Sequence, residues 1–322
     1  MHPTRPDRRR ALLRGVTLIE MVVVILLLGI LIGVTVYFLY PVTQSVDLTA
    51  RAELTDIADN ALQRIGRDVR LAVPNSVRVT SGGGASYLEF IPIRTAGRYR
   101  AGSGSVSGGS DCPDTGDGIP ASDQLSFAPV LDTCFKTIGL PQGIGVPPDV
   151  GGITARDFLV FNNYGTGFTN QDAYSSAGNP NRRQISAVSN EGTRLRIAFT
   201  SATNLDAVAH DSPGKRFFIV VGRATGAAQP EPVSYVCTPS PAGGTITRHW
   251  GYDLSAAQPT TFATGNQATV AADVTGCSFD YAQNVAPQIG LLTLQLELSR
   301  ALTGAVTQKV TLYHGVHVSN VP

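Results

Sequence analysis

The most constraining feature of the sequence is an apolar stretch near the N-terminus, GVTLIEMVVVILLLGILIGVTVYFLY at positions 15–40. As a helix rising about 1.5 Å per residue, residues 16–40 would extend about 37 Å, enough to cross a hydrocarbon core with some tilt. The flanking charged residues are Arg5, Arg8, Arg9, Arg10 and Arg14 before the stretch, and Asp47, Arg51 and Glu53 after it. Because basic residues stay on the cytoplasmic side, the sequence predicts a single inner-membrane span with a cytoplasmic N-terminus and an exported C-terminal part.

The span contains one acidic residue, Glu20, and it begins directly after Gly15. A carboxylate inside a span costs about 2.5–3.5 kcal/mol on insertion scales, so its presence indicates a function. A secretory signal would have its small-residue cleavage site behind the apolar run, whereas Gly15 precedes it. Cleavage after Gly15 would leave the span attached and give Val16 a new α-amine, one turn away from Glu20. The alternative is a simple anchor whose glutamate reaches the cytoplasmic interface.

The stretch GVTLIE, with its basic leader and apolar sequel, resembles the prepilin cleavage and methylation motif of type IV pilins and pseudopilins. The resemblance implies that a prepilin peptidase cuts after Gly15 and that the new N-terminus at Val16 is methylated. It also implies that Glu20 guides the subunit into a growing filament. The match departs at Val16, where the family usually has phenylalanine.

An amphipathic pattern continues behind the span to Val73. Its apolar stripe consists of Leu54, Ile57, Ala58, Ala61, Leu62, Ile65, Val69 and Ala72. We therefore predict one long helix whose second part, residues 41–73, packs on a folded domain. Pro41 and two glycines in the span favour bending, and Pro74 ends the helix. The phrase LQRIGRDVRLAVPNSVRV resembles this region in MSHA-type minor pilins and in J-type pseudopilins of general secretion.

After Pro74 the sequence alternates between apolar and polar residues, which is typical of short strands separated by turns. We predict strands at 76–80, 87–93, 124–130, 158–162, 184–188, 194–199, 217–221 and 233–237. The segment Ser189–Gly192 is expected to form a hairpin turn. Two stretches rich in glycine, serine and proline, 97–123 and 141–156, are predicted to be surface loops.

The last two predicted strands give the clearest alternation. Their apolar faces are formed by Leu292, Leu294, Leu296 and Leu298, and by Val310, Leu312, Val316 and Val318. We expect these strands to pair antiparallel. Together with RFFIVVG, GCSFDY and the terminal YHGVHVSNVP, they resemble an ordered series of motifs in MSHA-type minor pilins, so the resemblance covers both ends of the chain and leaves the middle unmatched.

The four cysteines all lie on the predicted exported side. They permit three pairings, of which we favour Cys112 with Cys134 and Cys237 with Cys277 because these are local in sequence. Each bond would restrict the unfolded chain by about 3–4 kcal/mol, and both imply an oxidising periplasm. A zinc site is a poor alternative, since no pair has C-x-x-C spacing.

Other functional classes find little support. The net charge is +1, with arginines concentrated in the leader, so we predict no nucleic-acid binding. The candidate catalytic or metal residues considered were His210, His249, His314, His317 and the Gly82-Gly83-Gly84 stretch. In a strand the last two histidines point to opposite faces, and the glycine stretch lacks the lysine and hydroxyl of a phosphate loop and is expected to be a turn. We predict that the chain is not an enzyme.

One acidic loop is a candidate for calcium. Its aspartates are Asp111, Asp114, Asp117 and Asp123. Their spacing does not match an EF-hand loop, and solvated turn aspartates are the commoner explanation. We therefore predict no bound cofactor and retain calcium as an alternative.

The sequence as a whole predicts an α+β protein of type IV pilin-like fold. Its parts are a basic leader at 1–15, a transmembrane helix at 16–40, its amphipathic continuation at 41–73 and a β-rich periplasmic or extracellular domain at 74–322. The resemblance implies a minor pilin-like subunit whose partners are other pilins, the prepilin peptidase, the inner-membrane assembly platform and the lipid bilayer. The alternatives are a J-type pseudopilin of type II secretion and a membrane-tethered or tip-located binding module.

Overall fold

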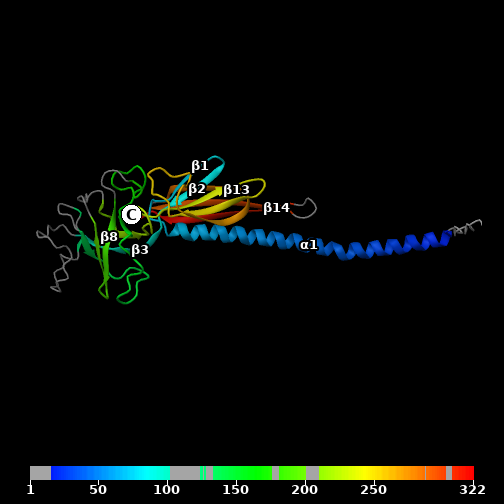
Figure 1. Cartoon of the computed structure of the whole chain (residues 1–322), viewed down its shortest axis with the longest axis horizontal. Coiled ribbons are helices and arrows are strands. Elements are labelled where there is room, and N and C mark those ends of the chain that lie inside the picture. The colour runs from blue at the N-terminus through cyan, green and yellow to red at the C-terminus, as the bar shows by residue number, and fades with distance from the viewer. Residues whose placement is uncertain are drawn as a thin grey trace, which may run out of the picture. The chain divides into compact units, whose positions relative to one another are not determined.

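A computed structural model describes residues 16–101, 124–125, 127, 133–175, 181–200, 210–286, 288–301 and 307–322, with only the backbone at 39–48 and 284–286. The chain divides into two compact units, Met1–Ala52 and Glu53–Pro322. An N-terminal apolar helix is followed by a β-rich domain whose strands are almost all antiparallel, so the α+β class is confirmed at this level (Figure 1).

The one long helix, α1, spans Leu18–Arg70. It ends three residues before the predicted Val73, because the chain there leaves the helix to join a sheet. The amides of Leu71 and Ala72 bond to carbonyls three residues back, which tightens the last turn, and the amide of Val73 donates to the Ile91 carbonyl at 2.9 Å. Proline at position 74 cannot continue the helix.

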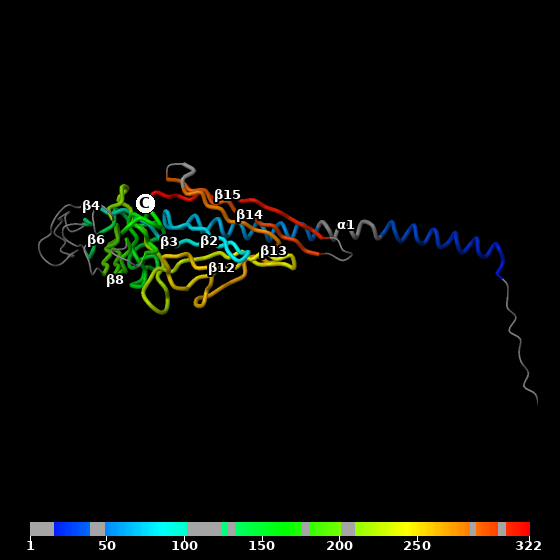
Figure 2. The backbone as a smooth tube through the Cα atoms, turned by 90° about the horizontal axis from the view of Figure 1, so that it is seen from above, coloured from blue at the N-terminus to red at the C-terminus, as the bar shows by residue number. Residues whose placement is uncertain are grey.

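Seven strands form an antiparallel sheet in the order β1-β2-β11-β12-β13-β14-β15. Their bounds are β1 Arg78–Gly82, β2 Ala85–Phe90, β11 Val233–Thr238, β12 Gly244–Trp250, β13 Asn266–Ala286, β14 Ile289–Ala301 and β15 Thr307–Ser319. One face of this sheet packs on the C-terminal part of α1, where Leu62 and Ile65 share a core with Leu294 and Leu296 (Figures 1 and 2). The amphipathic stripe predicted from the sequence is therefore the helix side of this core.

The helix and β15 approach closely at Gly66. A Cβ atom on this glycine would lie 3.0 Å from Nε2 of His314 and 3.2 Å from Cγ2 of Val316. The absence of a side chain thus lets the edge strand lie against the helix. His314 is on the helix-facing side of β15 and His317 on the other, as predicted.

A second sheet of six strands has the order β3-β10-β7-β8-β9-β6. Its strands are β3 Ile93–Arg98, β6 Cys134–Lys136, β7 Phe158–Phe161, β8 Arg182–Asn190, β9 Leu195–Phe199 and β10 Arg216–Val220. The short strands β4 Arg100–Ala101 and β5 Gln124–Leu125 pair with each other, and Leu125 packs in the core of this second sheet. An aromatic cluster around Phe135, Phe161 and Phe217 forms its core. A smaller cluster that includes Val73, Ile91 and Tyr174 connects the end of α1 with this second sheet.

Several local predictions are confirmed. Strand β14 pairs antiparallel with β15, with Leu296 opposite Leu312 and Leu298 opposite Val310. Strands β8 and β9 form a hairpin as predicted, but its turn lies at 191–194, because Ser189 and Asn190 still pair with Arg196 and Leu195. The glycine stretch is a tight turn between β1 and β2, in which Gly83 and Gly84 both have positive φ. The stretch 141–156 contains no helix or strand, as expected.

Other strands differ from the prediction. A surface loop is predicted from residue 97, but β3 runs to Arg98 and β4 covers Arg100–Ala101. The alternating pattern predicts neither β6 nor β12, and it predicts only the GCSFDY part of β13. Strand β12 and the first half of β13 carry threonine, arginine or alanine at both sets of alternating positions, so they show no apolar face. Strand β6, CFK, is only three residues long. The rest of the predicted loop, residues 102–123, lies outside the described residues.

The predicted disulfide between Cys237 and Cys277 is present and links β11 to β13 across β12. Cys134 is also disulfide-bonded, while its predicted partner, Cys112, lies outside the described residues. The bond at Cys237 closes a loop of 40 residues in the middle of the first sheet.

Candidate functional site

The N-terminal end of α1 carries the residues that the sequence singled out. The helix begins at Leu18, and the amide of Glu20 donates to the carbonyl oxygen of Thr17 at 3.1 Å and to its Oγ1 at 3.4 Å. Thr17 therefore occupies the N-cap position, and Glu20 is the third residue of the first turn. Threonine followed three residues later by glutamate is the pattern of a capping box. The predicted cleavage residue, Gly15, lies outside the described residues, and Val16 is exposed.

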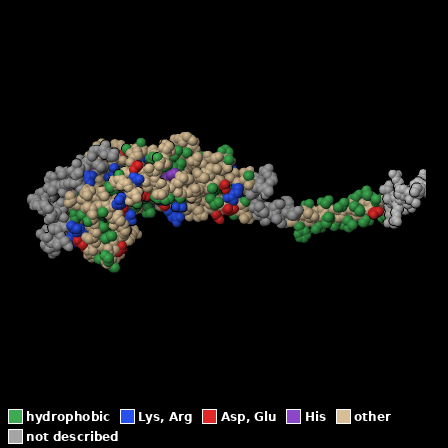
Figure 3. Space-filling model, viewed as in Figure 1, with side chains coloured by type: hydrophobic (Ala, Val, Ile, Leu, Met, Phe, Trp, Pro, Cys, Tyr) green, Lys and Arg blue, Asp and Glu red, His purple; other side chains and the backbone are tan. Residues whose placement is uncertain are grey.

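An apolar segment follows directly, Leu18–Phe38, with 21 residues and a mean hydropathy of 2.9. None of it is buried against the rest of the described chain, and hydrophobic side chains cover its visible surface (Figure 3). At about 1.5 Å per residue the segment extends about 31 Å, which matches the thickness of a hydrocarbon core. Its length and composition suit a single membrane span or a signal anchor.

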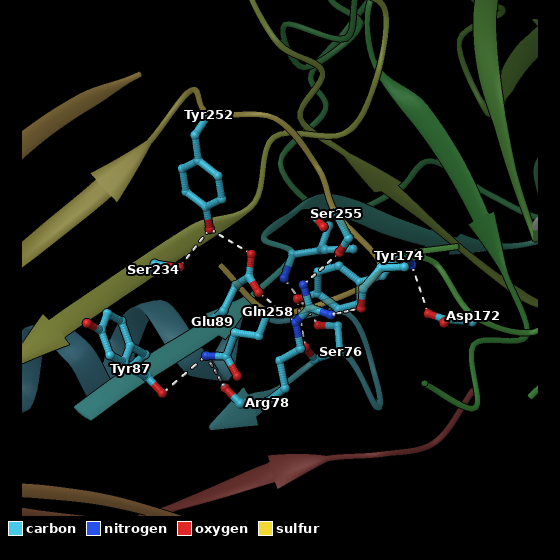
Figure 4. A network of polar contacts seen from close by, with 12 residues as sticks. Ser76, Arg78, Tyr87, Glu89, Asp172, Tyr174, Ser234, Tyr252, Ser255 and Gln258 are labelled. Carbon is cyan, nitrogen blue, oxygen red and sulfur yellow. Dashed lines mark hydrogen bonds and ion pairs between the residues drawn. The ribbon is translucent and has the colours of Figure 1, made fainter. Parts of the chain in front are cut away.

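A buried polar network lies where β1, β2 and β11 meet two loops (Figure 4). Glu89 on β2 is fully buried and accepts a 2.6 Å bond from Nε of Arg78 on β1. Its other oxygen accepts a 2.8 Å bond from the Tyr252 hydroxyl, which in turn lies 2.7 Å from Oγ of Ser234. A loop from the second sheet joins in, because the ring of Tyr174 lies 3.6 Å from the Arg78 guanidinium carbon.

The electrostatics of this network point to a structural role. Burial raises the pKa of Glu89, and Arg78 partly opposes this change. Burial also raises the pKa of the Tyr252 and Tyr174 hydroxyls well above their ordinary range, so both remain protonated donors. The remaining donors of Arg78 bond to the carbonyls of Ser255 and Ala256 at 2.8 and 2.6 Å. The network thus fastens two loops to the first sheet.

A second polar cluster holds the C-terminal residue. The Tyr99 hydroxyl donates to Asp211 at 2.7 Å and accepts a 2.9 Å bond from the amide of Ser212. The Ser212 hydroxyl donates to the Pro322 oxygen at 2.9 Å. Burial raises the pKa of the Tyr99 hydroxyl, and its hydrogen bond to Asp211 raises this pKa further. These contacts attach the end of the chain to the second sheet.

A pocket of about 530 Å³ opens between the loop after β10 and the turn after β12. Its lining includes Trp250, Glu231, Arg223 and Asn266. Burial raises the pKa of Glu231, with nearby arginines opposing the change. The guanidinium of Arg223 is held in an ion pair with Asp253. The residues that line the pocket therefore include a tryptophan, a half-buried glutamate and an asparagine.

The remaining candidates do not come together. His210 is buried and stacks on Phe127, and His249 stacks on Phe262 with ring centroids 4.3 Å apart. Burial lowers the pKa of His249. Within the part of the chain that the structure describes, no group of three histidine, cysteine or acidic residues is arranged to hold a metal ion. The acidic loop from Asp111 to Asp123 lies outside that part.

Sequence reasoning missed three features of these sites. The Thr17 cap has a signal, because threonine and glutamate are spaced as in a capping box. The contact between Glu89 and Tyr252 has no signal in the sequence, since the two residues are 163 positions apart. The pocket at Trp250 likewise brings together three separate segments.

Comparison of the chain with protein-family models, with curated proteins and with solved structures gives no match.

Proposed function

We propose that the chain is a minor pilin-like subunit that takes part in assembling or priming a type IV pilus of the MSHA type, where its sequence motifs resemble the minor pilin MshO. The observation that carries this proposal is the GVTLIE motif at the start of an exposed apolar helical segment, whose only acidic residue is Glu20. An apolar segment with no partner among the described residues suits first a bilayer and then a bundle of similar helices.

In this proposal the precursor lies in the inner membrane with its arginine-rich leader in the cytoplasm. Prepilin peptidase cleaves between Gly15 and Val16, and the new amine at Val16 is methylated. The amine then lies beside the first helical turn, where the carboxylate of Glu20 is favourably placed at the positive end of the helix dipole. Neutralisation of this carboxylate by the amine of a neighbouring subunit lets α1 pack among other pilins on the assembly platform.

The J-type pseudopilin alternative uses the same N-terminal chemistry and differs in the filament that incorporates the chain. Neighbouring genes distinguish the two, since they encode either pilus or type II secretion components.

A second candidate function is a displayed binding module, and the pocket at Trp250 is the observation that favours it. A lining that includes Trp250, Glu231 and Asn266 suits a neutral ligand with an apolar face and hydroxyl donors, such as a sugar ring. Deleting the gene would then abolish attachment and leave pili intact. Loss of the pili themselves would exclude this candidate.

The main proposal is tested by recovering filaments sheared from cells that express an epitope-tagged full chain. We expect the wild-type chain in the filament fraction. The Glu20→Val variant should insert in the membrane but enter filaments about tenfold less, because its carboxylate no longer pairs with a neighbouring amine. Asp280→Val, which removes an exposed acid on β13, is the matched control and should behave as wild type. Absence of the wild-type chain from filaments would overturn the proposal, and equal incorporation of Glu20→Val would show that the charge has no part in assembly.

A further inference from the structure

The C-terminal part of α1 exposes six charged residues in an ordered pattern. Three acids, Glu53, Asp56 and Asp59, precede three arginines, Arg64, Arg67 and Arg70, and all six side chains are exposed. Each triplet has a spacing of three residues, and each acid precedes one arginine by 11 residues. We call these six residues the charged stripe.

The stripe lies on the side of the helix opposite the core. At about 100° per residue, its members are centred about 180° from the buried Leu54, Ala58, Ile65 and Val69. Eleven residues are three turns plus about 20°, so the arginine triplet is nearly the acidic triplet translated along the axis by about 16 Å. A parallel copy of the helix, shifted by this distance, brings all three acids opposite all three arginines.

Contacts within the chain do not account for this pattern. Like charges three residues apart repel each other in an isolated helix, and no acid of the stripe has an arginine three or four residues away. The helix dipole favours arginines in the last turn, but it does not favour three acids far from the first turn. Glu53 bonds to Arg300 at 2.9 Å, and Asp59 accepts a 2.6 Å bond from Gln63. The acid four residues after Arg64 is Asp68, which lies off the stripe and is bonded to Arg248 at 3.1 Å and to the Tyr235 hydroxyl at 2.7 Å.

We propose that a second copy of this chain docks on the charged stripe in parallel, displaced along the helix axis by three turns. This inference rests on the proposed function, because a filament is what holds copies parallel and displaced. An antiparallel pair would also match the charges, but copies that enter one membrane from the same side have the same orientation. An in-register parallel pair would place acid against acid.

Two uncharged exposed residues beside the stripe, Asn60 and Leu71, are also 11 residues apart and report the register. Full chains carrying Asn60→Cys with one tag and Leu71→Cys with another are co-expressed, and sheared filaments are treated with a short bismaleimide. We expect at least a tenfold higher yield of this pair than of Asn60→Cys with itself or of Asn60→Cys with Gln63→Cys, which report in-register and antiparallel packing. Chains without added cysteines control for native thiols.

Charge reversal then tests the stripe itself. Adding Asp56→Lys and Asp59→Lys to the Asn60→Cys chain, or Arg67→Glu and Arg70→Glu to the Leu71→Cys chain, should each lower the product about tenfold. Both sets together should restore it to within threefold, and added salt should weaken the unmodified pair. Filaments that contain both tags but yield the in-register or antiparallel product, or no product, would overturn the docking and leave the proposed function standing. Unchanged product after charge reversal would also overturn it. Absence of both tags from filaments would instead count against the proposed function.

Discussion

Leu27 and Leu62 are leucines in the same helix, yet 60% of the first and 2% of the second is exposed. The apolar segment around Leu27 is hydrophobic on every side and has no partner in the described chain. The amphipathic segment around Leu62, residues 53–70, is hydrophobic on one side and covered there by the chain's own sheet.

The difference shows where each segment obtains its stability. An apolar stripe on one side of a helix can be buried by a domain of the same chain. Such a stripe is recognised in the sequence from apolar residues repeating every three and four positions. A helix that is apolar all round requires surroundings from outside the chain, either lipid or other helices. Changes in the first sheet should therefore affect the amphipathic segment and leave membrane insertion of the apolar segment intact.

Removing the disulfide should give the largest difference in stability between the two segments. Replacing both Cys237 and Cys277 with alanine frees a loop of 40 residues, which lowers the free energy of unfolding by about 4 kcal/mol on the loop-entropy model. Urea unfolding of the full chain in detergent micelles, followed by fluorescence of Trp250, the only tryptophan, measures this loss. Ser278→Ala on the same strand is the control. Loss of membrane association in the double variant would show that the apolar segment also depends on the first sheet, which would contradict this prediction.

A matched pair of leucine truncations should give the next largest effect. Leu62→Ala removes a buried side chain and should lower the free energy of unfolding by about 3 kcal/mol, whereas Leu27→Ala should change it by less than about 0.5 kcal/mol. The same fluorescence assay compares them in parallel. Equal losses in the two variants would mean that the apolar segment has a partner within the chain.

The smallest effect should be the pH dependence that Glu89 adds to the first sheet. Burial raises the pKa of this carboxyl in the folded chain, so its stabilising contribution is fully present below the ordinary value of 4.5 and is lost as pH rises through the folded pKa. The free energy of unfolding of wild type minus that of Glu89→Gln should therefore fall with rising pH above about 4.5 and then level off. Urea titrations from pH 4 to pH 8 test this, and a difference that rises with pH would contradict it.

Much of the fold was predictable because it depends on local periodicity. The leucines of β14 alternate without interruption, and the helix stripe repeats through Val69, so both elements follow from the sequence. Strand β12, GTITRHW, has only one fully buried apolar residue, Ile246, and β3 contains arginine, threonine and glycine. Such strands form because neighbouring strands pair with them, and single-sequence patterns do not carry that information.

The candidate sites likewise divide into those that a local sequence pattern predicts and those that depend on contacts between distant segments. Gly15, Val16 and Glu20 lie within six residues of one another and follow a recognisable spacing, so the N-terminal site can be predicted from the sequence alone. The network around Glu89 depends on Arg78, Tyr252 and Tyr174, which lie in three separate segments and meet only in the folded domain. The spacing of the charged stripe is present in the sequence, but its position opposite the buried face had to come from the packing of α1 on the sheet.

In the proposed function the apolar segment becomes the N-terminal helix of a processed subunit. N-terminal mass spectrometry of the full chain, recovered from the membranes and filaments of cells that assemble pili, tests it most directly. We predict a mature chain that begins with methylated Val16 and lacks residues 1–15. A chain that keeps its leader in these cells, or one cut beyond Phe38 so that the apolar segment is lost, would contradict the account.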